Sequence, residues 1–216
     1  MNQKELIHIK KVLNKNQCNS LISEYEDRKH TSETEACINA LTENVMESTF
    51  KKIELLPNTD NFNIVHNAIG TMIKDWVKNL NQKASTLILK NRVSFTHQYR
   101  LMCYEPGGWI HPHIDFDDYC YASCTINLNT DYKGGDFYFF NKKHKVKLAP
   151  GEAMIFPASP FWIHEVTEVT KGKRYSVNCF LLSIPFEVQN SVNQQIYESR
   201  KEHLNNPYYH NIKYEK

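Results

Sequence analysis

Two stretches in the first third of the chain place apolar residues at helical spacing. The first lies within QCNSLISEYED and shows the i, i+3, i+4, i+7 pattern at Cys18, Leu21, Ile22 and Tyr25. Asn16 is a candidate N-cap for it. Residues 62–80 repeat the pattern more strongly, and Asp60 or Asn61 is the candidate cap of that second helix. Residues 28–60 are polar and yield no assignment, so the pattern predicts two amphipathic helices before any strand.

From about residue 85 the apolar period changes from helical to two. One apolar row follows alternate positions, at Val93, Phe95, Tyr99, Leu101 and Cys103. Further short strands are expected at about 110–116, 121–128, 136–141, 145–149, 153–157, 162–169 and 174–182. Turn signals EPGG, DYKGGD, APGE and TKGK separate them. About eight short strands with helices at the N-terminus predict a mainly β fold, a sandwich or barrel with the helices outside.

Composition adds limits to this picture without changing it. The 216 residues fit one domain with a tail, and 41% hydrophobic with 23% charged residues is typical of a soluble globular protein. A net charge of +2 gives no sign of a nucleic-acid or membrane partner. The opening MNQKELIHIKK lacks a secretory pattern, and CFLLSIPF at 179–186 is too short to span a membrane. The six cysteines form no C-x-x-C pair, so we expect reduced thiols in the cytoplasm.

Residues 111–115, HPHID, carry three metal-ligating side chains at alternate positions. If this segment is a strand, His111, His113 and Asp115 point to one face, and periodicity selects no pair. At ~3.3 Å per residue, His111 and Asp115 lie about 13 Å apart, too far to share an ion. His113 with Asp115 and a distant histidine predicts a two-histidine, one-carboxylate iron site. His111 with His113 and an acid at Asp117 or Asp118 is instead similar to a cupin motif.

Three downstream residues bear on this choice. His164 lies 49 residues after Asp115, in the predicted strand FWIHEV. Arg174 follows ten residues later, on what we expect to be the neighbouring strand of a tight hairpin, and Ser176 shares its face. A guanidinium presents a planar fork of donors suited to a carboxylate, and the serine hydroxyl adds another donor. Arg174 begins a nearly apolar strand, so it needs an anionic partner that no neighbouring acid evidently supplies.

With these residues in order, about 96–183 resembles the catalytic core of the Fe(II)/2-oxoglutarate-dependent dioxygenases, in the prolyl 4-hydroxylase and procollagen lysyl hydroxylase branch. The residues that carry the resemblance are His113, Asp115, His164, Arg174 and Ser176. The flanking segments YEPGG, CTINLNTDYKGGDFYFF and PGEAMIFP also match in kind. A cupin has no use for an arginine ten residues beyond its last ligand, so the resemblance favours the dioxygenase.

The resemblance implies a double-stranded β-helix (jelly roll) core and a set of site roles. His113, Asp115 and His164 are the implied Fe(II) ligands. Arg174 and Ser176 are the implied anchor of the distal carboxylate of 2-oxoglutarate, with Tyr104 and Asn127 as further co-substrate contacts. Of the three metal-ligating residues in HPHID, His111 is then left over. Fe(II), 2-oxoglutarate and O2 are the implied cofactors and co-substrates, and ascorbate is an additional candidate.

The resemblance further implies hydroxylation of a C–H bond with release of succinate and CO2. The implied substrate is a prolyl or lysyl-type side chain in a protein, a peptide or a free amino acid. A cupin-type isomerase or oxygenase and a small-molecule tailoring hydroxylase are the alternatives. The expected domain spans 1–185, with helical support at 1–84 and the jelly roll at 85–185. The extension 186–216, with a possible helix at 188–203, is expected to be a lid, a dimer contact or a solvated tail.

Overall fold

The computed structural model describes residues 3–47, 49–81, 93, 95–96, 99–115, 119–183, 191 and 210–211. Within these ranges the helical segments are η1 (Gln3–Leu6), α1 (Lys15–Arg28), η2 (Lys29–Thr31) and α2 (Asp60–Asn81). The strands are β1 (His8–Lys11), β2 (Ala36–Ile38), β3 (Val45–Glu47), β4 (Lys51–Glu54), β5 (Phe95–Thr96), β6 (Arg100–Tyr104), β7 (Ile110–His113), β8 (Cys120–Asn127), β9 (Lys133–Gly134), β10 (Phe137–Phe139), β11 (His144–Val146), β12 (Glu152–Pro157), β13 (His164–Val166), β14 (Val169–Lys171), β15 (Arg174–Leu182) and β16 (His210–Asn211).

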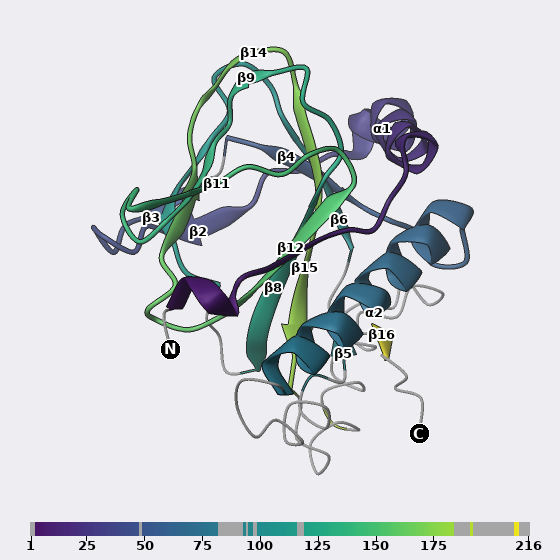
Figure 1. Cartoon of the computed structure of the whole chain (residues 1–216). Helices are drawn as coiled ribbons and strands as arrows, with labels where there is room; N and C mark the ends of the chain where they lie inside the picture. The colour runs from purple at the N-terminus through teal and green to yellow at the C-terminus, as the bar shows by residue number, and fades with distance from the viewer. Residues whose placement is uncertain are drawn as a thin grey trace.

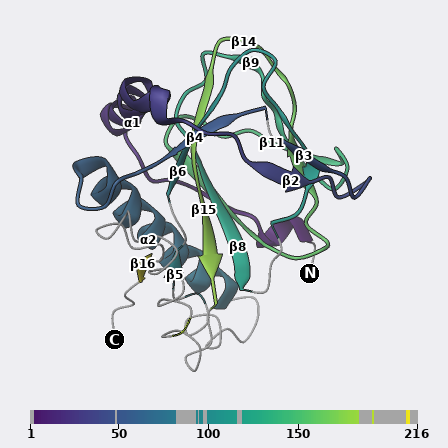
Figure 2. The ribbon, with the colours of Figure 1, turned by 180° about the vertical axis from the view of Figure 1, so that it is seen from behind.

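Two antiparallel sheets make up the body of the described chain. The larger has eight strands in the order β1-β12-β8-β15-β5-β16, with β6 paired to β15 and β4 paired to β6. The smaller has four strands in the order β11-β10-β13-β7. Figures 1 and 2 show α1 and α2 on one side of the large sheet and the β2–β3 hairpin on the other. The predicted mainly β fold with N-terminal helices is therefore confirmed.

The helix-facing side of the large sheet is apolar because alternate residues of its strands point there. These residues pack with α1 and α2 into one core that includes Leu101, Cys103, Ala122, Cys124, Ile126, Ala153, Ile155, Val177, Cys179 and Leu181. Both helices contribute their buried stripe to the same core, including Leu21, Tyr25, Ile69, Met72 and Trp76. The period-two row predicted for residues 99–103 is thus a core-facing row, and Cys124 packs there as a small hydrophobic residue.

The opposite side of the large sheet faces the small sheet through two separate apolar clusters. One joins β6 to β7 and β13 and contains Phe50, Met102, Tyr104, Ile110, Val166 and Val169. The other joins β12 to β10 and contains Phe139, Val146, Met154, Phe156 and Trp162. The remaining side chains on this face include buried polar ones, at Arg100, Ser123, Thr125, Arg174 and Ser176. Buried polar groups on a strand face require partners, so this face is where a functional site is expected.

Helix α1 begins one residue before its predicted cap, and helix α2 begins at the first of its two predicted caps. The N-cap of α1 is Asn14 and not Asn16, because Asn14 forms a capping box with Gln17: each side chain binds the other residue's backbone N–H. Helix α2 begins at Asp60, and the Thr59 hydroxyl accepts a hydrogen bond from the Phe62 N–H at 3.3 Å. The predicted cap Asp60 therefore lies in the first helical turn.

Three predictions about strands are wrong. The strand predicted at 110–116 ends at His113, so Asp115 follows the strand. The strand predicted at 162–169 ends at Val166, and β14 begins at Val169. Strand β13 pairs with β10 and β7, whereas β15 pairs with β5, β6 and β8, so His164 and Arg174 do not share a hairpin. Strands that are neighbours in sequence here belong to different sheets, because the chain passes through β14 between the small sheet and the large one.

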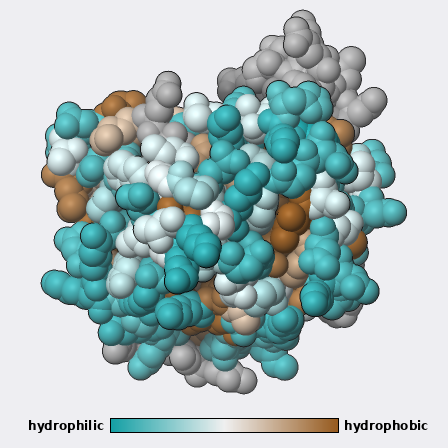
Figure 3. Space-filling view, turned by 90° about the horizontal axis from the view of Figure 1, so that it is seen from above, coloured by the Kyte–Doolittle hydropathy of each residue, from teal (hydrophilic) through white to brown (hydrophobic). Residues whose placement is uncertain are grey.

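The face seen from the β9–β14 end is mostly hydrophilic, with small separate hydrophobic patches (Figure 3). No helix in the described part of the chain is both long enough and apolar enough to cross a membrane. Two predictions concern segments outside the described residues. They are the possible helix at 188–203, of which only residue 191 is described, and the acids Asp117 and Asp118.

Candidate active site

The histidines His113 and His164 meet because of strand pairing. His113 is the last residue of β7 and His164 is the first of β13, and the two residues are directly opposite in the antiparallel register. Their ring centroids are 4.1 Å apart. Asp115 follows β7 by two residues, where the chain has left the strand and can turn its carboxylate toward both rings. The pairing of β7 with β13 therefore brings Asp115 and His164 together, although 49 positions separate them in the sequence.

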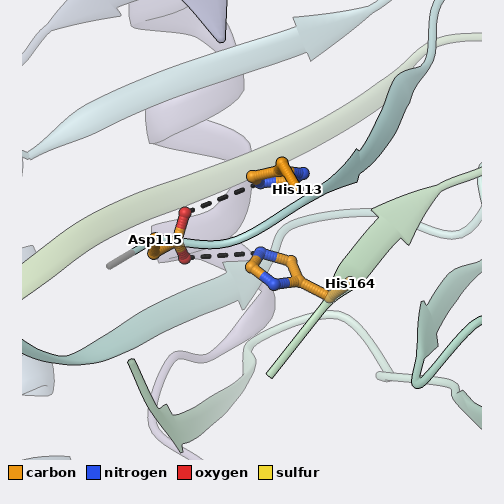
Figure 4. Close-up of side chains that lie close together, drawn as sticks. All are labelled: His113, Asp115 and His164. Carbon is orange, nitrogen blue, oxygen red and sulfur yellow. Dashed lines mark ion pairs between the residues drawn. The ribbon is translucent and has the colours of Figure 1, made fainter. Parts of the chain in front are cut away.

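Figure 4 shows the Asp115 carboxylate facing both imidazoles, with one ion pair to each. Its Oδ1 lies 3.5 Å from His113 Nε2, and its Oδ2 lies 3.3 Å from His164 Nε2. One ligand atom from each of the three residues falls within 4.8 Å of the others. All three side chains are nearly buried, since at most 11% of each is exposed. Two imidazole nitrogens and one carboxylate on one side of a point form the facial arrangement that suits a non-haem Fe(II).

Hydrogen bonds fix which nitrogen each imidazole presents. Nδ1 of His113 donates to the His111 carbonyl, and Nδ1 of His164 donates to the Trp162 carbonyl, both at 2.9 Å. A proton on Nδ1 leaves the Nε2 lone pair unprotonated and directed at Asp115. Backbone carbonyls orient metal-binding histidines in this way in many sites. The donor set therefore fits a divalent metal by chemistry as well as by spacing.

A serine that the sequence did not indicate holds the carboxylate. The hydroxyl of Ser123, in β8, donates to Asp115 Oδ2 at 2.6 Å, and the residue is fully buried. Burial on its own would raise the pKa of Asp115, but the imidazoles of His164 and His113 hold that pKa well below its usual value. Burial also lowers the pKa of His113, with the neighbouring His164 acting in the same direction. The lowered pKa of Asp115 favours an ionised carboxylate, and the lowered pKa of His113 favours a neutral imidazole. These are the protonation states that bind a metal.

An aromatic shell surrounds His164. The Phe137 ring stacks on it at 5.4 Å between centroids, and Phe156 meets it edge-on at 4.9 Å. These rings belong to the apolar side of the small and large sheets, where they exclude water from one side of the candidate metal position. A dry wall of this kind strengthens electrostatic contacts with a bound ion.

Arg174 lies in the same cavity as the triad and is 4% exposed. Its Nη1 contacts the Ser176 hydroxyl at 3.3 Å, and its guanidinium carbon lies 5.0 Å from the centre of the Tyr104 ring, to which it is paired in register. Its Nε has no hydrogen-bond partner among the described residues. None of the ion pairs found within the described residues involves Arg174. A buried guanidinium without a carboxylate is costly, so its place in a cavity wall fits an anionic ligand.

The DYKGGD turn packs against the stem of this arginine. Gly135 has φ of +61°, and a Cβ on it would lie 3.0 Å from Arg174 Cδ. Both the backbone conformation and the close approach favour glycine here. The turn that sequence punctuation marks between two strands therefore also helps to position Arg174.

One cavity of about 530 Å³ brings these residues together. Its wall includes His113, Asp115, His164, Tyr104, Arg174 and Ser176. A volume of this size is typical of sites for small ligands. Burial raises the pKa of Tyr104 to about 12, although Arg174 acts in the opposite direction, so its phenol stays protonated at neutral pH. Six of the seven residues predicted for metal or co-substrate binding thus surround one space.

Asn127 lies outside this cavity. Its amide donates to the carbonyls of Asn129 and Leu148 at 2.7 and 3.0 Å, and it lines a neighbouring pocket behind Arg174. These bonds support the turns at the end of β8.

The His111 side chain also lies apart from the triad. Its Nε2 is 3.4 Å from the Cys37 Sγ. It is not a member of the group of close ligand atoms formed by His113, Asp115 and His164.

The sequence also did not indicate a second charged group in the cavity wall, formed by Arg100, Glu35 and Asn178. Arg100 and Asn178 are paired in register on β6 and β15, two positions beyond Met102 and Ser176. The period-two pattern could have placed Arg100 and Asn178 on the cavity face with Arg174. Nothing in the sequence indicates Glu35, because it comes from the unassigned segment before β2.

Comparison with protein families agrees with this geometry. Residues 99–182 match the family model of the 2OG-Fe(II) oxygenase superfamily. The match contains all three triad residues and Arg174, and it confirms the predicted resemblance to this superfamily over that region. It also confirms the predicted enzyme class, an oxidoreductase of the dioxygenase type. A search of curated protein sequences found no match.

Solved structures of prolyl hydroxylases share the fold. A Pseudomonas putida prolyl-4-hydroxylase superposes with a TM-score of 0.63 at 17% identity, over 83% of this chain and 93% of the other. A viral collagen prolyl hydroxylase from Paramecium Bursaria Chlorella virus-1 gives 0.59 at 13%, over 83% and 97%. A Trichoplax adhaerens prolyl hydroxylase, in complex with a hypoxia inducible factor peptide fragment, gives 0.60 at 15%, over 83% and 84%. At these identities the likeness establishes the fold, so the predicted double-stranded β-helix core is confirmed.

Proposed function

We propose that this chain is an Fe(II)- and 2-oxoglutarate-dependent dioxygenase that hydroxylates a C–H bond of its substrate and releases succinate and CO2. The observation that carries the proposal is the pairing, in one cavity, of a buried triad with a buried arginine that has no carboxylate partner among the described residues. A metal site alone would fit many enzymes. A separate unpaired guanidinium in the same cavity is what a metal-chelating dicarboxylate co-substrate requires.

Each residue has a defined task in this proposal. His113, Asp115 and His164 would hold Fe(II) through their two Nε2 atoms and the carboxylate. Arg174, with the Ser176 hydroxyl, binds the distal carboxylate of 2-oxoglutarate, and the protonated Tyr104 lies within reach of the same group. When bound, the iron supplies the O2 chemistry that couples decarboxylation of 2-oxoglutarate to hydroxylation. The protein orients both ligands and excludes water.

The substrate proposed is a prolyl or lysyl-type side chain in a protein, a peptide or a free amino acid. One relative in fold carries a bound peptide fragment, which supports a peptide-sized partner at the open side of the cavity. A small-molecule tailoring hydroxylase is the second candidate, because the cavity volume also fits a free small substrate. Ascorbate dependence, a cytoplasmic location and a dimer through residues 186–216 stay predictions.

The proposal is tested by succinate formation from 2-oxoglutarate under Fe(II) and O2, with amino acids and peptides as candidate substrates. Slow succinate release without substrate is expected from the wild type and is expected to be lost in His113→Ala. Metal binding that persists in Asp115→Ala, together with no succinate release under any condition, would instead favour a cupin-type enzyme with another ligand set.

A further inference from the structure

The cavity wall holds a second buried arginine, Arg100, which the proposed chemistry does not use. It is 5% exposed and lies on β6, four residues before Tyr104. Four residues along a strand correspond to about 13 Å. Arg174 is opposite Tyr104 and Arg100 is opposite Asn178, so the two guanidinium groups start from well-separated points of the wall. The cavity wall therefore carries two cationic side chains that come from separate positions on neighbouring strands.

Arg100 is held firmly on its wall. Its Nη1 donates to both carboxylate oxygens of Glu35, at 2.8 and 2.7 Å, and its Nη2 donates to the Asn178 Oδ1 at 2.5 Å. Its guanidinium carbon also lies 4.2 Å from the centre of the Phe180 ring, which gives a cation–π contact. Both Asn178 and Phe180 belong to β15, the strand that carries Arg174. Three contacts and burial fix the position of this charge.

The counterion of Arg100 is more exposed to solvent than the arginine itself. The Glu35 side chain is 34% exposed, against 7% for Arg100, and Glu35 precedes β2, outside the two main sheets. If the pair separates, the Glu35 carboxylate can be solvated by water at little cost in free energy. The Arg100 guanidinium is buried and would stay unsolvated. When a second carboxylate arrives, the exchangeable member of the pair is therefore Glu35.

Arg100 also has unused donor capacity. A guanidinium offers five N–H donors, and the bonds above use three. Its Nε has no hydrogen-bond partner among the described residues. The same orphaned atom occurs on Arg174, the proposed anchor for 2-oxoglutarate. In this respect the two arginines of the cavity are alike. They differ because, among the described residues, Arg100 pairs with a carboxylate and Arg174 does not.

We propose that Arg100 anchors a carboxylate of the substrate, which replaces Glu35 on the guanidinium when the substrate binds. The inference rests on the proposed function and narrows its substrate class to compounds with a carboxylate near the reacting C–H bond. That carboxylate is either the α-carboxylate of a free amino acid or chain end, or an acidic side chain in a peptide. Glu35 then acts as a resting counterion that neutralises Arg100 while the cavity has no substrate.

The test is a binding titration of the holoenzyme, loaded with Fe(II) and 2-oxoglutarate under anaerobic conditions and followed by calorimetry. One arm compares the twenty L-amino acids with their α-amides. The other compares glycine-flanked tripeptides containing Asp or Glu with those containing Asn or Gln. We expect at least one acid to bind about 10- to 100-fold more tightly than its neutral partner, the range for a hydrogen-bonded charge. The arm in which this occurs identifies the source of the carboxylate.

Two variants have opposite expected effects. Arg100→Met should reduce the preference for the acid to less than about 2-fold, while Glu35→Gln should tighten binding of the acid and leave binding of the neutral partner unchanged. A purely structural pair would lower thermal stability in both variants and weaken acid and neutral ligands alike. Arg28→Met is the matched control, because Arg28 forms an arginine–glutamate pair with Glu24 at 2.6 Å in α1, outside the cavity wall.

Three results would overturn the proposal: no acid exceeds its neutral partner, Arg100→Met weakens both equally, or Glu35→Gln weakens the acid. If Arg100→Met does not fold, Arg100→Lys serves instead, since it keeps the charge but loses the planar fork, and partial loss of the preference is expected. Failure of the proposed function is separate, because it appears as absent succinate release in the wild type whatever the result of these titrations.

Discussion

The hydroxyl of Ser123 offers a sharp test of how the triad is built. Ser123→Ala removes the hydrogen bond to Asp115 Oδ2 and leaves the rest of the site unchanged. Without it, the carboxylate keeps its ion pairs with His113 and His164, the two ligands with which it must share a metal. The carboxylate can then turn toward either imidazole, and metal binding has to restore its orientation.

The expected magnitude follows from this geometry. A buried hydrogen bond to a charged group contributes about 1.5–3 kcal/mol. The Ser123 bond is present before the metal binds, so only the part that orients Asp115 enters the affinity. Loss of such an orienting partner typically weakens metal binding by about 10- to 100-fold, or about 1.4–2.7 kcal/mol. We expect this increase in the dissociation constant for Fe(II) or Mn(II), with little change in the concentration of 2-oxoglutarate required.

The chain provides a matched control in Ser176→Ala. Both serines are buried on the cavity face of the large sheet, at 0% and 1% exposure, and both variants remove one hydroxyl. Ser176 contacts Arg174 and not the triad, so its loss should raise the 2-oxoglutarate requirement and leave metal affinity within about 2-fold. Calorimetric metal titration and succinate assays separate the two effects. Equal metal affinity in Ser123→Ala and the wild type would refute the orienting role.

Three further outcomes are expected. Arg174→Ala should raise the 2-oxoglutarate concentration needed for succinate release by at least about 10-fold with metal affinity retained, and unchanged 2-oxoglutarate affinity would contradict its assignment. His111→Ala should keep metal binding and His113→Ala should lose it, as measured by metal titration; loss in both would return His111 to the ligand set. The Tyr175 hydroxyl, with Lys29 and Lys173 nearby and against the effect of burial, lowers the pKa of Glu26 from 4.5 to about 2. Because the folded-state pKa is lowered, this stabilisation is present above pH 4.5 and is lost as the pH falls toward 2. Glu26→Gln should therefore cost about 1–2 kcal/mol at pH 7 in denaturant unfolding, after allowance for partial exposure; a cost that persists at pH 2 would contradict this account.

The chemistry of the candidate site was largely predictable from residue types and order along the chain. His113, Asp115, His164 and Arg174 line one cavity as expected. Asn127 shows the limit of such reasoning. It alternates with Ser123 and Thr125 on β8, yet its amide turns to two turn carbonyls at the end of the strand. Alternation predicts a face, while local hydrogen bonds decide which group a side chain meets.

Local patterns along this sequence determine its two long helices, most of the strands after residue 95 and its candidate ligands. Apolar periods of 3.6 and of two define the helices and the strand faces, since both depend on neighbours a few positions away. Long-range pairing decides the rest. The register that sets His164 opposite His113, the transfer of β15 to the other sheet, the hydroxyl that holds Asp115 and the approach of Glu35 to Arg100 all join residues that no local pattern relates. Because strand pairing is selected by packing of whole faces, these contacts exist only in the folded chain.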